Sequence, residues 1–532
     1  MKPLLRVLIK IAIFSIAIII VGFNTSFCTA EIDRQQSLNV ESIFGVGYAD
    51  YPPRDPLIKD FKIAELYAQA GIKWIKTAII VNWRFLEPNP PVNDRHIYLW
   101  DKKIMGIMSL DGLVQAYQDK DMGFIFTIRT VSPWATRLVL KPQPTEVATP
   151  PKDNKWRDFE EFVFNLVERY DGDGINDMPG LKTPIVYYEL ESEAQHAGYW
   201  QGTPEEYIKL LQVAYGAAKR AYPSVKLILS GINMGDIFDD IGPTSPNADV
   251  TNRVQKFGSL LATVKRNDLE FIRKSIAAGD YYDIIEFHWN RDYMGAYKTV
   301  DFIKQELQRH GLEKPIWAGD ATSAPWLSPL AGDINPKFKA RGDELSRSAI
   351  DSGHTNYESV NRWLRAEQAK LIVKKYLVGM ELGLKKVIME TTVDWPMPER
   401  TPYHRNWHIQ GMVDASGKPK PAYYTLKLMV EKLDGFSSVE RLSMGEGFWV
   451  YKVMVKDRPI YVLWFESGKI SGPGEKPAEA DVGLSLDTMS IKITHIVTEV
   501  NKTMPVVETK ELKGKTLNVR LTDAPVIIEE LQ

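Results

Sequence analysis

From about residue 44 the sequence alternates short β-rich runs with longer helical patterns, and this alternation constrains the fold more than any other feature. Eight such runs occur, each bounded by turn signals and followed by room for at least one helix. Eight β/α units are typical of a (β/α)₈ TIM barrel, whose functional side chains lie at the C-terminal ends of the strands. The expected strands are Phe44–Tyr48, Lys73–Ile79, Gly123–Arg129, Pro184–Leu190, Lys226–Gly231, Asp283–His288, Lys314–Gly319 and Lys386–Glu390.

The helix expected after the fourth strand is the most clearly marked one. Thr203 and Glu206 form a capping box with proline between them at the first helical position. Apolar residues follow at helical spacing through Ala221, and Pro223 ends the helix.

The pattern changes after Leu433, where strand signals follow one another without helical spacing between them. We therefore expect a barrel over residues 44–433 and a small all-β, sandwich-like domain over residues 434–532. No long linker separates the two, so the β domain is expected to pack on the barrel with Trp464 and Tyr461 in its core. Its expected strands are Phe448–Val455, Pro459–Phe465, Ile491–Val497 and Leu517–Glu530.

The N-terminus has the layout of a secretory signal over residues 1–30. Basic residues precede an apolar stretch, Ile11–Phe23, and small residues around Ala30 offer a cleavage site. We expect cleavage after Ala30 and a secreted or periplasmic protein; an uncleaved N-terminal membrane anchor is the alternative. Cys28 is the only cysteine, so the chain cannot form an internal disulfide or a thiolate metal site.

Composition and motifs exclude several classes of partner. With 66 Lys and Arg against 68 Asp and Glu, the net charge of −2 argues against a nucleic-acid partner. No glycine-rich phosphate loop follows a strand, so no cofactor is expected. The acidic loop at residues 171–177 is similar to a calcium loop, but Lys182 stands where the twelfth-position Glu is required, so no metal site is expected either.

Three glutamates lie at and beyond the end of the fourth expected strand. Strand alternation would direct Glu189, Glu191 and Glu193 toward one face, at a cost of several kcal/mol unless partners compensate their charges. Alternatively the strand ends near Leu190, and Glu191 and Glu193 are solvated loop charges.

A second acid, Asp320, follows the seventh expected strand. By itself an aspartate in this position is most often a helix cap or a turn residue. Together with Glu193, however, it gives two carboxyls from opposite sides of a barrel mouth. Such a pair can hydrolyse a glycosidic bond, one carboxyl protonating the leaving oxygen while the other attacks the sugar or activates water.

Three segments of the barrel carry a family resemblance: residues 171–193, residues 202–207 (Gly-Thr-Pro-Glu-Glu-Tyr) and residues 417–424 (Gly-Lys-Pro-Lys-Pro-Ala-Tyr-Tyr). The first runs from Asp-Gly-Asp-Gly-Ile-Asn-Asp into Tyr-Glu-Leu-Glu-Ser-Glu. Residues 44–433 thereby resemble the clan A glycoside hydrolases, closest to the xylosidase/iduronidase and cellulase-like branches. The resemblance implies that Glu193 is the acid/base, that Asp320 stands at the nucleophile position, and that the partner is a carbohydrate.

The chain departs from the family pattern at three positions. Ser192 stands where the family has an asparagine that contacts the sugar, and Lys76 stands where an arginine is common. Asp320 replaces a glutamate and is shorter by one carbon–carbon bond, about 1.5 Å. We therefore expect Asp320 to be either the nucleophile or a base that activates water.

Further residues are candidates for binding the sugar. His288 matches a histidine that the family places near the nucleophile, although a hydrogen-bonded core histidine fits as well, and Glu286 shares its strand face. Glu390 is a reserve carboxylate at the end of the eighth strand. Trp395 and Trp134 follow strands and could cover a sugar ring, or they could be packing residues.

Two hypotheses of different classes follow. The first is a secreted glycoside hydrolase that acts on an oligo- or polysaccharide. The second is a catalytically inactive barrel that binds carbohydrate or serves as an envelope scaffold, and the departures at Ser192 and Asp320 favour it. The buried acidic residues favour the hydrolase, because buried charges are costly unless they have a task.

Overall fold

The computed structural model describes residues 42–531 except 52–54, 105, 107, 139–146, 239–249, 291, 324–343, 346–347, 350, 396–406 and 469–470. The signal expected at residues 1–30 lies outside the described residues. None of the helices in the described part of the chain has the length and apolar character that crossing a membrane requires.

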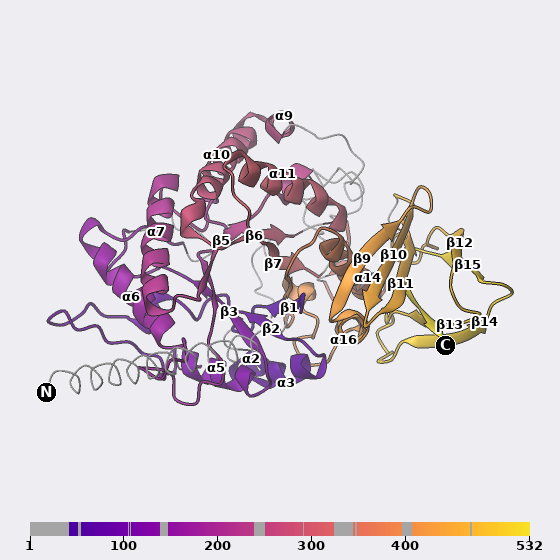
Figure 1. Ribbon diagram of the computed structural model, residues 1–532, viewed down its shortest axis with the longest axis horizontal. Helices are drawn as coiled ribbons and strands as arrows, with labels where there is room; N and C mark the ends of the chain where they lie inside the picture. Colours follow the sequence, from indigo (N-terminus) through magenta and orange to yellow (C-terminus); the bar gives the residue numbers. More distant parts are fainter. Residues whose placement is uncertain are drawn as a thin grey trace, which may run out of the picture. The chain divides into compact units, whose positions relative to one another are not determined.

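Eight parallel strands close into a barrel, each paired with its neighbours in chain order, and β8 pairs with β1 (Figure 1). The (β/α)₈ barrel expected from the alternation of β and helical patterns is confirmed. The strands are β1 Phe44–Gly47, β2 Trp74–Lys76, β3 Gly123–Ile128, β4 Tyr187–Leu190, β5 Lys226–Ile232, β6 Ile284–Trp289, β7 Ile316–Thr322 and β8 Val387–Glu390.

Two strands differ from their expected ranges for local reasons. β2 ends at Lys76 because the Asp50 carboxylate accepts hydrogen bonds of 2.7–2.8 Å from the backbone N–H groups of residues 78–80, which turns this segment into a loop. β7 continues past Gly319 to Thr322, and its pairing with both neighbours shifts register near Gly319. A register shift of this kind changes the direction in which the following side chains point.

Helices connect the strands on the outside of the barrel (Figure 1). α7 has both hydrogen bonds of the capping box predicted at Thr203 and ends at Ala221 as expected. The helices are α2 Pro56–Lys59, α3 Lys62–Gln69, α4 Trp83–Leu86, α5 Leu110–Gln118, α6 Trp156–Glu168, α7 Pro204–Ala221, α8 Gly235–Phe238, α9 Val250–Val254, α10 Ser259–Ala277, α11 Ala296–Arg309, α14 Tyr357–Glu381, α15 Trp407–Gln410 and α16 Pro421–Leu433, with 3₁₀ turns η1 Asp153–Lys155, η2 Gly279–Tyr281 and η3 Tyr293–Gly295.

The barrel interior changes from apolar to charged along the strands. The apolar layer comprises Trp74, Ile125, Ile228, Ile284, Trp317 and Ile388, with Tyr187 packed against it. Inward-facing residues of a strand are two positions apart, so the next layer toward the C-terminal ends lies two residues further on. That layer includes Lys76, Glu189, Glu286 and Glu390, all buried. The charged groups therefore lie on an apolar floor that excludes water from below.

The C-terminal domain contains a six-stranded sheet in the order β14-β13-β16-β11-β10-β9 and a two-stranded sheet of β12 and β15. Its strands are β9 Phe436–Leu442, β10 Phe448–Val455, β11 Arg458–Phe465, β12 Ala480–Ser485, β13 Ser490–His495, β14 Val506–Glu511, β15 Thr516–Leu521 and β16 Val526–Leu531.

The prediction of a single strand over Leu517–Glu530 is wrong. β15 and β16 are separate strands that pair in different sheets, β15 with β12 and β16 with β11 and β13. Three further strands, β9, β12 and β14, were not predicted from the sequence. β14 is exposed along its whole length and therefore lacks the alternation of apolar and polar residues that reveals a half-buried strand.

The sheet and the barrel share one hydrophobic core, as the absence of a linker predicted. Trp449 and Trp464 stack with their ring centroids 5.6 Å apart, and Tyr293 of the barrel packs edge-on against Trp464 at 6.0 Å. Lys374 of α14 forms an ion pair of 3.2 Å with Glu466 at the end of β11. Trp464 and Tyr461 are both buried, as expected of core residues.

Trp464→Ala is expected to lower the free energy of unfolding by about 3–5 kcal/mol, because it leaves a cavity where the sheet meets the barrel. Denaturant unfolding followed by circular dichroism measures this change. Val507→Ala on β14, where the side chain is 51% exposed, is the control and should change stability by less than about 0.5 kcal/mol. Equal effects of the two substitutions would contradict a shared core.

Candidate active site

Lys76 lies at the centre of a buried group of carboxylates. Its ammonium nitrogen is 3.0 Å from Glu189 and 3.2 Å from Asp320, and its shortest ion pair is with Glu286. One cation therefore joins β2, β4, β6 and β7. Burial lowers the pKa of Lys76, but the charges of Asp320 and the two glutamates outweigh burial and raise the pKa well above its usual value.

Two glycines make room for these side chains. A Cβ atom at Gly319 would lie 1.6 Å from the carboxyl carbon of Glu286, and one at Gly231 would lie 1.9 Å from Nε2 of His288. Both distances are far below van der Waals contact, so a larger residue at either position would displace its partner. Gly231 of β5 and Gly319 of β7 are thus required for the arrangement of these buried charged side chains.

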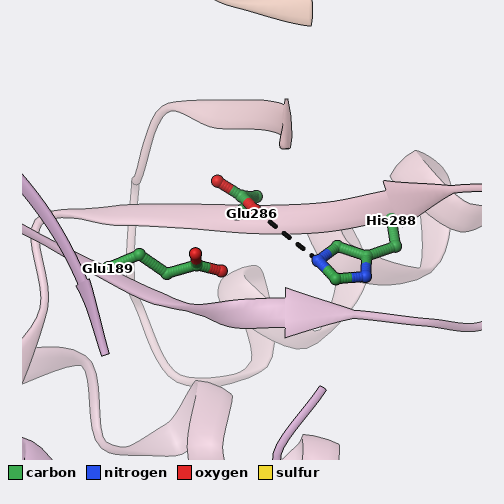
Figure 2. Close-up of side chains that lie close together, drawn as sticks. All are labelled: Glu189, Glu286 and His288. Atoms are coloured by element: carbon green, nitrogen blue, oxygen red, sulfur yellow. Dashed lines mark ion pairs between the residues drawn. The ribbon is translucent and has the colours of Figure 1, made fainter. Parts of the chain in front are cut away.

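His288 of β6 lies between the two carboxylates that the sequence singled out. Its Nδ1 is 2.6 Å from Oε1 of Glu193, while its Nε2 is 3.6 Å from Asp320 and 3.7 Å from Glu286. Figure 2 shows the His288 ring approaching the Glu286 carboxyl, with Glu189 on the opposite strand. Because both nitrogens belong to one ring, the Glu193 and Asp320 carboxylates lie at most about 9 Å apart, which does not exceed the largest separation found in glycosidase acid pairs.

Glu193 lies in the loop after β4 and is held by neighbours from β5 and β6. Asn233 donates a hydrogen bond of 2.9 Å to its Oε1, the oxygen that also faces His288. The loop itself is anchored by Ser230, whose hydroxyl accepts the N–H of Ala194 at 3.1 Å. Only 10% of the Glu193 side chain is exposed, so it is not the solvated loop charge that the alternative considered.

The expectation that three glutamates share one face is wrong for Glu191. β4 ends at Leu190, and both Glu191 and Glu193 adopt positive φ angles of 63° and 47°, so strand alternation stops there. The Glu191 carboxylate turns toward the end of β3, where it accepts hydrogen bonds from Thr130 and pairs with Arg129 at 3.5 Å. Glu191 therefore fastens the loop, and Glu189 and Glu193 reach the central cluster.

Asp320 is bound from the side of β1 as well. The Tyr48 hydroxyl donates a hydrogen bond of 3.2 Å to its Oδ2. Tyr48 packs against Trp395, whose ring also lies 4.2 Å from that of Tyr51. Tyr48 thus connects Trp395 to the carboxylate of Asp320.

Glu390 ends β8 beside the last residue of β7, Thr322, with which it pairs. Burial, and then the charge of Asp320, raise the pKa of Glu390 to about 8 against the opposing charge of His288. At neutral pH Glu390 is therefore a neutral carboxylic acid. A neutral carboxyl in this position can donate a hydrogen bond.

The remaining carboxyls divide into protonated and ionised groups. Burial and the charge of Glu286 raise the pKa of Glu189, whereas Lys76 and His288 overcome burial and lower the pKa of Glu286. Burial disfavours ionisation of Glu193 too, but its hydrogen bond to His288 and the charge of that ring lower its pKa to about 2. Burial lowers the pKa of His288, but the charge of Asp320 and the contacts with Glu193 and Glu286 outweigh burial and raise the pKa well above its usual value. Without substrate, Glu193 is thus an anion paired with an imidazolium.

Among the residues that the structure describes, two groups of side chains have a spacing that could hold a metal ion. In the first, Glu189, Glu286 and His288, the Lys76 ammonium already lies between the carboxylates and supplies the positive charge. The second group is Asp171, Asp173 and Asp177, in the loop that is similar to a calcium loop in sequence. The carboxylates of these aspartates accept hydrogen bonds from backbone N–H groups of their own turn.

The contacts of Trp134 lie outside this cluster in the described part of the chain. The Trp134 indole donates to the Glu87 carbonyl at 2.9 Å, its ring lies 5.3 Å from that of Trp83, and the Lys155 ammonium lies over it at 5.1 Å. These contacts are those of a packing residue. Ser192 is half-buried between Glu191 and Glu193.

Several residues of the site were not identified from the sequence. These residues touch the central carboxylates or their histidine partners, and they are Tyr48, Asn233, His196 and Asp268. Tyr48 and Asn233 each directly follow a barrel strand, which is the available signal. Asp268 lies in the middle of α10, where no sequence pattern marks it.

No protein-family model and no curated protein sequence matches the chain. Solved structures do share its fold. A family 39 glycoside hydrolase from the gut symbiont Bacteroides cellulosilyticus WH2 is 14% identical with a TM-score of 0.56, over 92% of this chain and 81% of that one. A monomeric β-xylosidase from Caulobacter crescentus CB15 is also 14% identical with a TM-score of 0.56, over 92% and 96% of the two chains.

An α-L-arabinofuranosidase from Thermotoga maritima is 10% identical, with a TM-score of 0.53 over 92% of this chain and 96% of that one. These proteins are clan A glycoside hydrolases with the TIM-barrel fold. The resemblance to that clan, inferred from three segments of the sequence, is therefore confirmed for the fold.

Lys76→Met is expected to destabilise the protein by about 3–5 kcal/mol at pH 8, because buried carboxylates lose their cation. Without Lys76 the folded-state pKa values of these carboxyls rise, so the folded state takes up protons as the pH falls. The difference in the free energy of unfolding between Lys76→Met and wild type should therefore shrink as the pH falls from 8 to 5.

Urea unfolding at several pH values measures this difference. Lys120→Met, which removes an exposed ion pair with Glu65, is the matched control and should change the free energy of unfolding far less, because solvent screens this pair. A loss of unfolding free energy in Lys76→Met that is as small as in Lys120→Met, or that does not change with pH, would contradict the role of Lys76 as the central counter-ion.

Proposed function

We propose that the chain is a glycoside hydrolase that cleaves O-glycosidic bonds of an oligo- or polysaccharide. Glu193 is the general acid/base, and Asp320 is the nucleophile or the base that activates water. The observation that carries this proposal is the position of His288, whose two ring nitrogens face these two carboxylates at 2.6 Å and 3.6 Å. The fold shared with glycoside hydrolases supports the same reaction class.

The separation of the two carboxylates is compatible with either form of the reaction. Retaining enzymes hold their carboxyls about 5–5.5 Å apart and inverting enzymes about 6.5–9.5 Å. In the retaining form Asp320 attacks the anomeric carbon, and water later displaces it. In the inverting form Asp320 takes a proton from the water that attacks. The shorter side chain of aspartate favours the second, because it leaves more room for a water molecule.

The proton for the leaving group has a defined source in this site. Glu193 is ionised without substrate and shares a 2.6 Å hydrogen bond with the protonated His288 ring. As an anion Glu193 has no proton to give, so the proton that the His288 imidazolium loses as it becomes neutral first moves to Glu193. As the bond between the anomeric carbon and the glycosidic oxygen breaks, the neutral Glu193 carboxyl gives this proton to that oxygen and becomes an anion again.

The neighbouring side chains supply contacts for the sugar. Glu390, as a neutral acid, donates a hydrogen bond to a ring hydroxyl, and Trp395 covers an apolar sugar face beside Tyr48. The contacts of Trp134 give it less support as a sugar platform. The signal expected at residues 1–30 would place this reaction in a secreted or periplasmic protein.

Glu193→Gln is expected to lower the hydrolysis rate by about 10²–10⁴-fold, because it removes proton transfer while keeping the shape of the side chain. Asp320→Asn should lower it at least as much. A screen of chromogenic glycosides and polysaccharides with wild type and both variants measures the rates. Asp119→Asn, in an exposed ion pair with Lys182, is the control and should keep the wild-type rate.

Unchanged rates in Glu193→Gln would contradict its assignment as the acid/base. A wild-type protein that binds glycans but cleaves none in the same screen would favour the inactive, carbohydrate-binding barrel instead.

Glu390→Ala is expected to raise KM about tenfold through loss of one hydrogen bond, and Glu390→Gln should raise it less because the amide still donates. The pKa of Glu390, about 8, lies above that of an unfolded glutamate, so its donor proton is present below pH 8 and lost above it. KM of wild type should therefore rise above pH 8 relative to KM of Glu390→Gln. Parallel KM profiles from pH 6 to pH 9 would contradict the proposal that Glu390 donates to the sugar.

A further inference from the structure

The two oxygens of Glu193 have different surroundings. Oε1 is occupied by His288 and Asn233 at 2.6 Å and 2.9 Å. Oε2 faces a second histidine, His196, whose Nε2 is 3.7 Å away. Because Oε1 is already bonded twice, Oε2 is the oxygen left to exchange a proton with a glycosidic oxygen.

His196 is fixed on its other side by a buried acid. Its Nδ1 is 3.2 Å from Oδ2 of Asp268, which lies on α10 and whose side chain is 10% exposed. The backbone N–H of His196 also donates to the Glu193 carbonyl at 2.8 Å, so a single turn carries both residues. Asp268, His196 and Glu193 therefore form a line from the outer helix to the acidic cluster.

The two histidines differ in exposure, and this difference separates their tasks. The His288 side chain is 2% exposed, whereas that of His196 is 22% exposed. His288 therefore belongs to the interior, and His196 stands where the cluster meets solvent. The Asp268 carboxylate forms an ion pair with Nδ1 and so favours one orientation of the His196 ring.

We propose that His196, held by Asp268, is a positioning residue that controls the protonation of Glu193 at Oε2. The inference rests on the proposed glycosidase function for its meaning, but the pairing of the three side chains can be tested without activity. The charged groups that face His196 are Glu193 from its own loop and Asp268 and Lys265 from α10. Burial and Lys265 disfavour the imidazolium, but Asp268 and Glu193 outweigh them and raise the pKa of His196 above its usual value.

The first test is an NMR titration of the histidine rings in the substrate-free protein, with His196 assigned by its loss in His196→Asn. Asp268→Asn and Glu193→Gln should each lower the pKa of His196 by about 1, because each removes a negative charge from one nitrogen. Glu270→Gln is the matched control: it lies on the same helix in an exposed ion pair with Lys274 and should leave the pKa of His196 unchanged.

A His196 pKa that does not respond to Glu193→Gln would overturn the inference, whether or not the protein is a glycosidase. The remaining histidine resonances show whether each variant is folded. If one of Asp268→Asn and Glu193→Gln does not fold, the other still tests the pairing.

The second test is the pH profile of kcat/KM on a glycoside that the wild type hydrolyses. The His196 imidazolium stabilises the Glu193 anion, so His196→Asn should raise the pKa of the acid/base and move the basic limb of the profile to higher pH. Asp268→Asn should move it in the same direction by less, because its amide still holds the ring. A uniform loss of rate with unmoved limbs would indicate a merely structural histidine and overturn the inference. If the wild type hydrolyses no glycoside, the proposed function fails, while the NMR result still decides the pairing.

Discussion

The site depends on keeping several carboxyls charged in a space that excludes water. Glu189, Glu286 and Asp320 surround one ammonium, that of Lys76, and the His288 ring faces two of them and Glu193 as well. Two cations can balance this many acids because some of the acids keep their protons. Burial and neighbouring charges raise the pKa of Glu189 and Glu390 while His288 lowers that of Glu193. The protonation pattern is therefore a property of the cluster and of no single residue.

The barrel makes this arrangement possible through steric features of its backbone. Glycines at positions 231 and 319 leave space that His288 and Glu286 fill, and the register shifts of β7 bring Asp320 inward. The apolar layer beneath, which includes Trp74 and Trp317, closes the barrel below the charges. Low polarity below and charge above strengthen each ion pair, and they also make the loss of any one partner costly.

The same geometry connects the site to chemistry. Glu193 reaches His288 through one oxygen and His196 through the other, so two imidazoles of different exposure act on one carboxylate. In the proposed reaction His288 supplies a proton from the interior, while His196, paired with Asp268, adjusts how readily Glu193 holds that proton. The pairing of Asp268 with His196 thus links the outer helix α10 to Glu193 at the centre of the barrel.

The sequence by itself determined the barrel, because the alternation of β and helical patterns, the capping box at Thr203 and the change of pattern after Leu433 are all local signals. It also indicated Glu193, Asp320 and His288, since functional groups of a barrel follow the strands. Tertiary structure alone decided that Glu191 turns to Arg129, that Lys76 joins three acids and that Asp268 holds His196. These pairings link residues far apart in the chain. After Leu190 the positive φ angles of Glu191 and Glu193 end the alternation of the strand, so the period of the strand no longer predicts where these two side chains point.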